Sequence, residues 1–224
     1  HGSNYENRTL FTQHILFEKD SVSLLNSGKV LWGAPMGVGQ GKQSQFTYLV
    51  NTAGINAQSS IKAYAHLAST SYTTGGQFDF YWNDQLAHTT KLQPVSGFLF
   101  DDIAKEALDS FILNNAQTWP SKSNLKVGYT SASTSATGWI DYVELNVYKP
   151  IGFWQDSSVA FSIEKDFQKG QIVNCKIQDI DATSIIWNVT NPESPLQVEL
   201  QFENTSSASF IQQVDTIVRF FGVK

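Results

Sequence analysis

The stretch Ile61-Lys62-Ala63-Tyr64-Ala65-His66-Leu67 indicates the fold class of this chain. Successive side chains of a β-strand point to opposite faces, so apolar residues at every second position predict a strand with one buried face. A strand with one buried and one polar face is typical of antiparallel sheets. The predicted buried face carries Ile61, Ala63, Ala65 and Leu67, and the other face carries Lys62, Tyr64 and His66.

The same period of two recurs along the first two thirds of the chain. Clusters of Gly, Ser, Thr and Asn separate the segments and predict turns between them. Six or more short strands at this spacing predict an all-β sandwich. Beyond the first stretch, the predicted strands are 45–50, 77–82, 123–129 and 139–147.

Residues 100–115 do not follow the pattern as clearly. They begin with Asp101-Asp102, which could cap a helix, and they include good helix formers. An apolar stripe at helical spacing is absent, so we expect a loop or short turn that leads into a strand.

A domain boundary is expected at Tyr148-Lys149-Pro150, because proline cannot donate a hydrogen bond to a sheet. The predicted organisation is a β-sandwich domain over residues 1–149 and a smaller β subdomain over 150–224. The strands expected in the second part are 159–163, 171–178, 184–189, 197–203 and 216–221.

Composition excludes several classes of function. Of the 224 residues, 16% are charged and 41% hydrophobic, which is typical of an ordered extracellular β protein rather than a disordered segment. The net charge of −5 and the absence of a basic run argue against a nucleic-acid partner. No apolar stretch is long enough for a transmembrane segment.

The sequence offers no complete catalytic constellation, so we expect no catalytic residue and no cofactor-binding residue in this chain. The one cysteine, Cys175, shares a predicted strand face with Val173 and Ile177, and we expect it to be a buried apolar residue. His14, His66 and His88 are widely separated and lack metal-binding spacing. The glycine-rich run 33–41 precedes a strand rather than a helix, so a phosphate loop is not expected.

Acidic and aromatic residues are the remaining candidates for binding. The pairs Glu18 with Asp20, Asp141 with Glu144, and Asp101 with Asp102 could supply oxygen ligands to a structural calcium, although solvated surface carboxylates explain them equally well. Exposed rings can stack on sugars, whereas most rings fill cores. Phe78, Phe80 and Trp82 share a face that we expect to be buried, which leaves Tyr72, Tyr81 and Trp119 as candidate carbohydrate-binding residues.

Two longer motifs carry a resemblance to a known family. They are Gly138-Trp139-Ile140-Asp141-Tyr142-Val143-Glu144-Leu145-Asn146 and Ile186-Trp187-Asn188-Val189-Thr190-Asn191-Pro192, and Ser27-Gly28-Lys29-Val30-Leu31-Trp32-Gly33 precedes them. With these motifs the chain resembles the region before the peptidase domain in surface sortases of the Bacteroidota type IX secretion system, the PorU family of gingipain-like cysteine peptidases. Family members usually read Trp-Tyr-Gly-Glu where this chain has Leu31-Trp32-Gly33-Ala34, as a divergent paralogue would.

The resemblance implies a non-catalytic scaffold or docking region on the extracellular face of the outer membrane. A downstream peptidase domain of the parent protein would process secreted cargo and anchor it at the surface. Partners would be that domain, secretion-system components or cargo proteins, and we expect Trp139 and Trp187 to be core anchors. The alternative is a carbohydrate-binding or adhesion module that binds surface polysaccharide.

A second similarity concerns the fold of the first domain. The segment 139–145 is similar to the closing strand of carbohydrate-binding jelly rolls, some of which hold a structural calcium there. This similarity implies a jelly-roll-like sandwich with Asp141 and Glu18 as calcium ligands.

Overall fold

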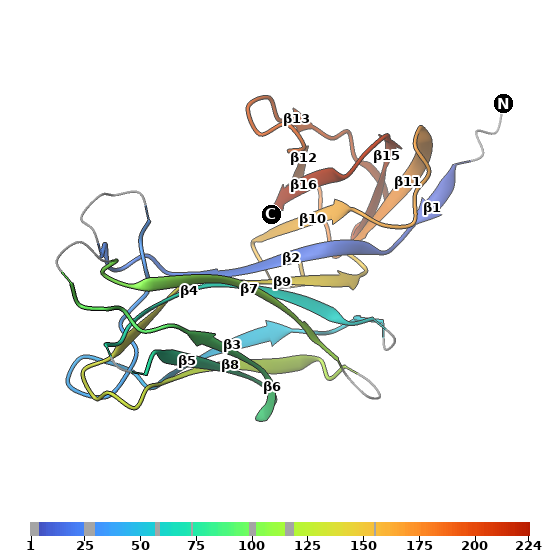
Figure 1. Ribbon diagram of the computed structural model, residues 1–224. Coiled ribbons are helices and arrows are strands. Elements are labelled where there is room, and N and C mark those ends of the chain that lie inside the picture. The colour runs from blue at the N-terminus through green and yellow to red at the C-terminus, as the bar shows by residue number, and fades with distance from the viewer. Residues whose placement is uncertain are drawn as a thin grey trace. The chain divides into compact units, whose positions relative to one another are not determined.

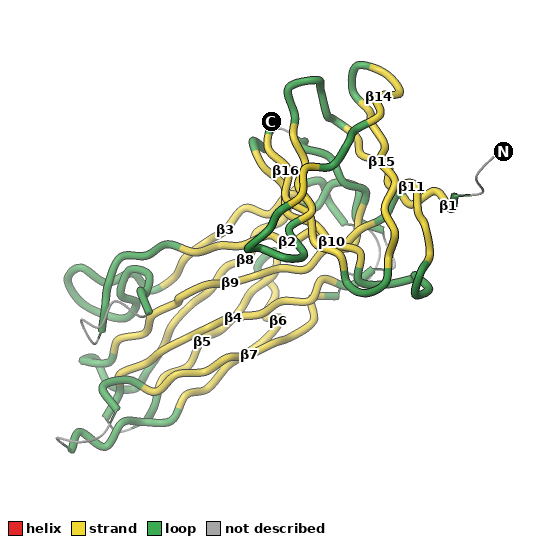
Figure 2. The backbone as a smooth tube through the Cα atoms, turned by 90° about the horizontal axis from the view of Figure 1, so that it is seen from above, coloured by secondary structure: helices red, strands yellow, loops and turns green. Residues whose placement is uncertain are grey.

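The structure is a computed structural model that describes residues 5–24, 30–56, 59–72, 74–98, 102–114, 119–154 and 156–224. These residues form strands and loops without a helix, as Figure 2 shows, and the all-β prediction is confirmed. They therefore contain no apolar helix of membrane-spanning length. The strands are β1 (Glu6–Arg8), β2 (Phe11–Glu18), β3 (Gln45–Asn51), β4 (Ile61–Thr70), β5 (Gly76–Trp82), β6 (Gln85–Leu92), β7 (Lys105–Leu113), β8 (Lys122–Thr130), β9 (Thr137–Lys149), β10 (Ser158–Ile163), β11 (Gln171–Gln178), β12 (Ile185–Asn188), β13 (Leu196–Gln197), β14 (Gln201–Asn204), β15 (Ser207–Val214) and β16 (Val218–Val223).

The buried and exposed faces of β4 and β5 are those that the period-two patterns predicted. On β4 the apolar face is buried while Lys62 is exposed, and on β5 Phe78, Phe80 and Trp82 are all buried. Residues 105–113 form strand β7, so the prediction of a turn followed by a strand is confirmed there. Asp101 and residues 27–29 lie outside the described residues.

The described chain divides into two compact units. The first comprises residues 1–15, 54–59 and 146–224, and the second comprises residues 16–53 and 60–145. Strands β2 and β9 each contribute residues to both units, since the divisions fall within them.

The second unit is an antiparallel sandwich. One sheet has the order β3-β8-β5-β6, and β9, β4 and β7 are neighbours in the other (Figure 1). Ring contacts join the two sheets: Phe80 on β5 lies 4.7 Å from Phe111 on β7 between ring centroids, and Phe17 on β2 stacks 4.7 Å from Tyr48 on β3. The apolar faces of the two sheets therefore pack against each other, as in other β-sandwiches.

The first unit contains the smaller β subdomain and is also built from two groups of strands. One sheet has the order β1-β11-β15-β14, and the strands of the other follow the order β13-β12-β16-β10-β2. Phe161 on β10 is the centre of its aromatic core, in contact with Phe11 and Phe220. The remaining core residues are Ile151, Phe153, Val159, Ile163, Val173, Cys175, Ile177, Ile180, Ile186, Ala208, Phe210, Val214 and Val218.

The N-terminal segment belongs to this unit through a parallel strand pair. Strand β1 pairs with β11, with Glu6 opposite Val173 and Arg8 opposite Cys175. The sequence did not reveal this strand, because three residues are too few to show a period. Strands β2, β6 and β15 were also missed.

Two expectations for the C-terminal region are wrong. The strand predicted at 197–203 is broken into β13 and β14, which belong to different sheets. Trp187 is only half-buried, whereas Trp139 is buried with 9% of its surface exposed. Side chains alternate along β12, so Ile186 takes the core-facing position and Trp187 points to the other face.

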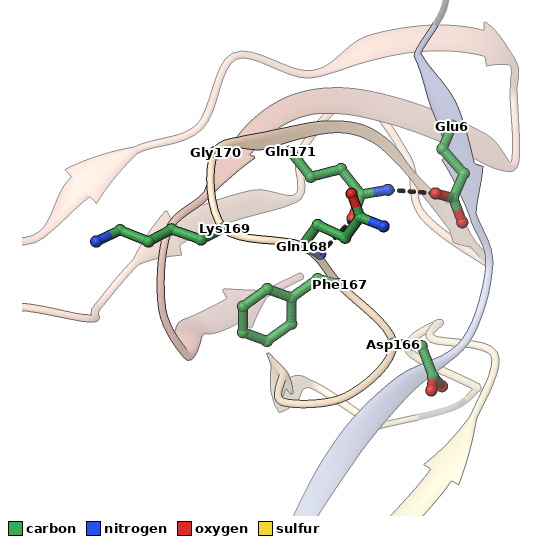
Figure 3. A pocket seen from close by; sticks show the side chains of 7 residues that line it. All are labelled: Glu6, Asp166, Phe167, Gln168, Lys169, Gly170 and Gln171. Atoms are coloured by element: carbon green, nitrogen blue, oxygen red, sulfur yellow. Dashed lines mark hydrogen bonds between the residues drawn. The ribbon is translucent and has the colours of Figure 1, made fainter.

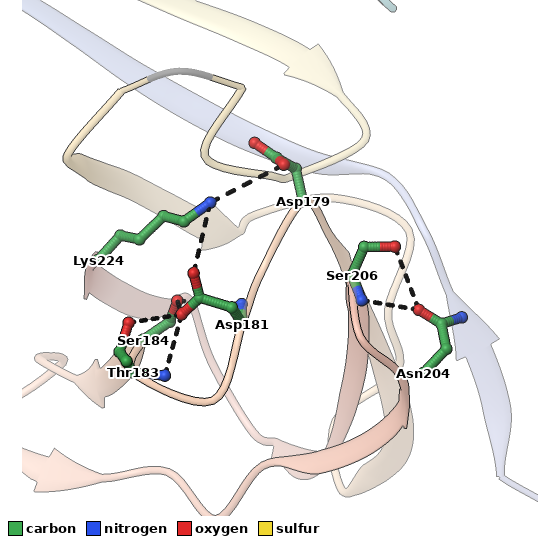
Figure 4. A network of polar contacts seen from close by, with 7 residues as sticks. All are labelled: Asp179, Asp181, Thr183, Ser184, Asn204, Ser206 and Lys224. Atoms are coloured by element: carbon green, nitrogen blue, oxygen red, sulfur yellow. Dashed lines mark hydrogen bonds and ion pairs between the residues drawn. The ribbon is translucent and has the colours of Figure 1, made fainter.

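Polar contacts hold the loop between β11 and β12 (Figure 4). The carboxylate of Asp181 accepts hydrogen bonds from the backbone N–H and the hydroxyl of Thr183, at 2.9 and 2.6 Å. These bonds lower the pKa of Asp181. The Nζ atom of Lys224 lies 3.7 Å from Asp181 Oδ2. In the turn between β14 and β15, the side-chain oxygen of Asn204 accepts hydrogen bonds from the N–H and the hydroxyl of Ser206.

Candidate functional site

A cavity of about 370 Å³ in the second unit is the strongest candidate for a functional site. Its walls are mainly apolar, and acidic residues stand among the lining residues. The lining residues are Leu16, Phe17, Glu18, Lys19, Gly33, Ala34, Gln43, Phe46, Tyr48, Ile140 and Asp141.

Three strands, β2, β3 and β9, supply the apolar part of the cavity. Phe17 comes from the end of β2, and Phe46 and Tyr48 come from alternate positions of β3. Ile140 on β9 is buried. Burial raises the pKa of Tyr48 to about 12, so its hydroxyl stays protonated well above neutral pH and can donate a hydrogen bond.

Three carboxylates meet at this cavity. Glu18, Asp20 and Asp141 each place an oxygen within 4.8 Å of the other two, although Asp141 is more than 120 positions away along the chain. The structure thus brings together Asp141 and Glu18, the two ligands that the jelly-roll similarity implied, and Asp20, which the sequence analysis paired with Glu18. Glu144, which the sequence paired with Asp141, is not one of the three.

His66 holds the carboxylate of Asp141 in place. Its Nδ1 lies 2.8 Å from Asp141 Oδ2, its Nε2 lies 3.4 Å from Glu106, and its ring is 4.8 Å from that of Trp32. Glu18 and Asp20 form no ion pair with any lysine or arginine in the described part of the chain. This role of His66 could not be inferred from the sequence, which shows only that His66 lies on the polar face of β4.

The donor set suits a hard cation. Carboxylate oxygens are the ligands that Ca²⁺ prefers, and three carboxylates can supply three to six of the six to eight oxygens that it needs. A cation between the three carboxylates would offset the repulsion between their negative charges. Glu18, Asp20 and Asp141 are therefore the residues that could hold a metal.

The three candidate carbohydrate-binding rings have different surroundings. Tyr72 lies in a loop and is 56% exposed. Tyr81 on β5 is half-buried, with the amine of Lys126 over its ring at 5.8 Å. Trp119 is half-buried and makes an edge contact with Trp82. Tyr72 is the candidate with the most accessible ring.

A second cavity is lined by Glu6 and residues 166–171 of the first unit (Figure 3). Several of its polar groups form hydrogen bonds with one another. The side-chain amide of Gln171 donates to the carboxylate of Glu6, and its oxygen accepts a bond from the backbone of Gln168. Arg8 donates to the backbone oxygen of Asp166. These contacts tie the turn between β10 and β11 to β1, which is a structural role.

Cys175 is a buried core residue, as predicted. Its side chain is fully covered on β11, and burial raises the pKa of the thiol to about 12. Since the thiolate is the reactive form, the thiol is protonated at neutral pH and inert.

We expect a bulky maleimide to leave Cys175 unlabelled in the native protein and to label it rapidly in urea. Cys175→Ser should fold and lose at most about 1–3 kcal/mol of the free energy of unfolding, because it places a hydroxyl in an apolar site. Mass spectrometry of the labelled protein reads the first result. Rapid labelling without urea would show that the thiol is exposed.

No protein-family model matches this sequence, and no curated protein matches it. Among solved structures, the chain is similar to dimeric latent PorU from Porphyromonas gingivalis, with a TM-score of 0.66 and 13% sequence identity. It also aligns with a carbohydrate-binding module, CBM36, in complex with calcium and xylotriose, at a TM-score of 0.34 and 11% identity. That second alignment covers 59% of this chain and 98% of the module.

The similarity to PorU covers 100% of this chain and 21% of that chain. The resemblance found in the sequence is therefore confirmed at the level of the fold, along the whole chain. This chain spans about a fifth of the length of that PorU structure. The TM-score of the carbohydrate-binding module is too low to carry an argument.

Proposed function

We propose that this chain is a non-catalytic scaffold and docking region of a type IX secretion system sortase. In this proposal it stands on the extracellular face of the outer membrane, and a peptidase domain elsewhere in the parent protein processes and anchors secreted cargo. Secretion-system components or cargo proteins would dock on the β units described above.

The observation that carries the proposal is the match in fold to PorU along the entire chain. Two features of the residues support a binding role rather than a catalytic one. Cys175, the one cysteine in the sequence, is buried with its thiol protonated. The cavity of the second unit offers apolar walls and carboxylates, which suit recognition.

The proposal is tested by sequencing the gene on the 3′ side of the codon for Lys224. We expect codons for a gingipain-like peptidase domain with its own catalytic His and Cys. A stop codon or an unrelated domain at that place would contradict the proposal and leave the carbohydrate-binding function as the better one.

A carbohydrate-binding or adhesion module is the second candidate function, and the exposed ring of Tyr72 is the observation that favours it. A ring of this kind can stack on a sugar and leave its hydroxyl free for hydrogen bonds. Affinity electrophoresis in gels that contain surface polysaccharide tests it. Retardation of the wild-type chain that is lost in Tyr72→Ala, and kept in Tyr5→Ala, would support this function.

We further propose that Glu18, Asp20 and Asp141 bind Ca²⁺ weakly, with a dissociation constant of about 10⁻⁴–10⁻³ M, typical of extracellular modules. At 10 mM Ca²⁺ a site of about 1 mM would add about 1.4 kcal/mol to the free energy of unfolding. Thermal unfolding with and without CaCl₂ measures this effect. Glu18→Gln should reduce it, whereas Glu199→Gln, which changes an exposed acid of the other unit, should not.

A further inference from the structure

The cavity of the second unit lies beside a free strand edge. Within the described residues, β3 is the terminal strand of its sheet and pairs with β8 on one side only. An edge strand presents unpaired N–H and C=O groups, to which an extended polypeptide can add as a further strand. Phe46 and Tyr48 of the same strand line the cavity, so a segment bound along β3 would pass its mouth.

The walls of the cavity suit the stem of a long side chain. The rings of Phe17 and Tyr48 stack with centroids 4.7 Å apart and planes at 29°, and Leu16 contributes a further apolar surface. Lysine and arginine bury their methylene groups along such surfaces while the charged group stays near polar atoms. Aromatic faces add a favourable cation–π contact.

The charges of the cavity select a cation. Glu18 and Asp141 line it. A carboxylate oxygen of Asp20 lies within 4.8 Å of a carboxylate oxygen of each of them. Lys19 is the one basic residue among the lining residues. Two carboxylates in the lining and a third beside it leave an excess of negative charge, which favours a positively charged group and opposes an acidic one.

We propose that this cavity binds a basic side chain, arginine in preference to lysine, of an extended polypeptide that docks along β3. The guanidinium group has five N–H donors in a planar fork and can bond two carboxylates at once, which an ammonium group does less well. The proposal rests on the docking function proposed above and names the chemistry of the partner. Ca²⁺ would use the same carboxylates and would compete with the side chain.

The test is an NMR titration of the ¹⁵N-labelled 224-residue chain with Nα-acetyl-arginine-N-methylamide, with the lysine and norleucine analogues as comparisons. Shift changes are expected at residues 16–19, 46–48 and 140–141, strongest for arginine, weaker for lysine and weakest for the uncharged norleucine. Glu18→Gln should weaken arginine binding about 3-fold to 5-fold, as the loss of an exposed ion pair does. Glu199→Gln should leave it unchanged, and 0.5 M NaCl should weaken it.

Three results would overturn the proposal. Equal binding of the norleucine analogue would mean that the cavity recognises apolar groups only. No shift change at 20 mM of the arginine analogue would mean that no such site exists. If Ca²⁺ binds to the same residues and an excess of the arginine analogue does not displace it, the cavity would be a metal site instead. Each result is read on this chain alone, so it is independent of whether the gene encodes a peptidase domain.

Discussion

Replacing Trp139 by alanine should lower the free energy of unfolding by about 3–5 kcal/mol, the usual cost of truncating a large buried aromatic side chain. Trp139 is buried on β9, where it packs with Trp32 and Ala68. Alanine would leave a cavity that rigid strands cannot close. Urea denaturation followed by far-UV circular dichroism measures the change.

Trp187→Ala is the matched control, because Trp187 belongs to the other motif that suggested the family and is only half-buried. Its loss should be clearly smaller than that of Trp139→Ala. A loss under about 1 kcal/mol for Trp139→Ala would be typical of a surface position and would contradict the packing described here.

Strand existence and strand faces could be predicted wherever the alternation was long. The stretch 61–67 and the buried rings of β5 are examples, since one covered face forces apolar residues to every second position. β1 and β13 could not be found in this way, because they contain three and two residues. The pairing of β1 with β11 depends on contacts between residues more than 160 positions apart, which no local pattern records.

The candidate site was predictable in part. Similarity to a jelly-roll closing strand named Asp141 and Glu18, and the fold does bring them together. The cavity itself could not be predicted, because its walls come from β2, β3, β9 and the loop around Gly33. The contact of His66 with Asp141 depends on the neighbouring positions of β4 and β9 and was equally hidden.

In the first unit, replacing Phe161 by alanine should lower the free energy of unfolding by about 3–5 kcal/mol. Phe161 is buried on β10, stacks on Phe220 with centroids 5.0 Å apart, and meets the edge of Phe11 at 5.4 Å. Aromatic pairs of this geometry contribute about 0.5–1.5 kcal/mol beyond the area that they bury. The substitution removes both pairs and opens the centre of the core, so the loss should lie near the upper end of the range.

Phe221→Ala is the control for that effect. Phe221 follows Phe220 on β16, points to the opposite face and is 39% exposed, so its truncation should cost much less. Phe161→Leu should fall between the two, because leucine fills most of the volume without the ring contacts. Equal losses for Phe161→Ala and Phe221→Ala in urea denaturation would mean that the two faces of these strands are not buried differently, and the core of the first unit would have to be assigned anew.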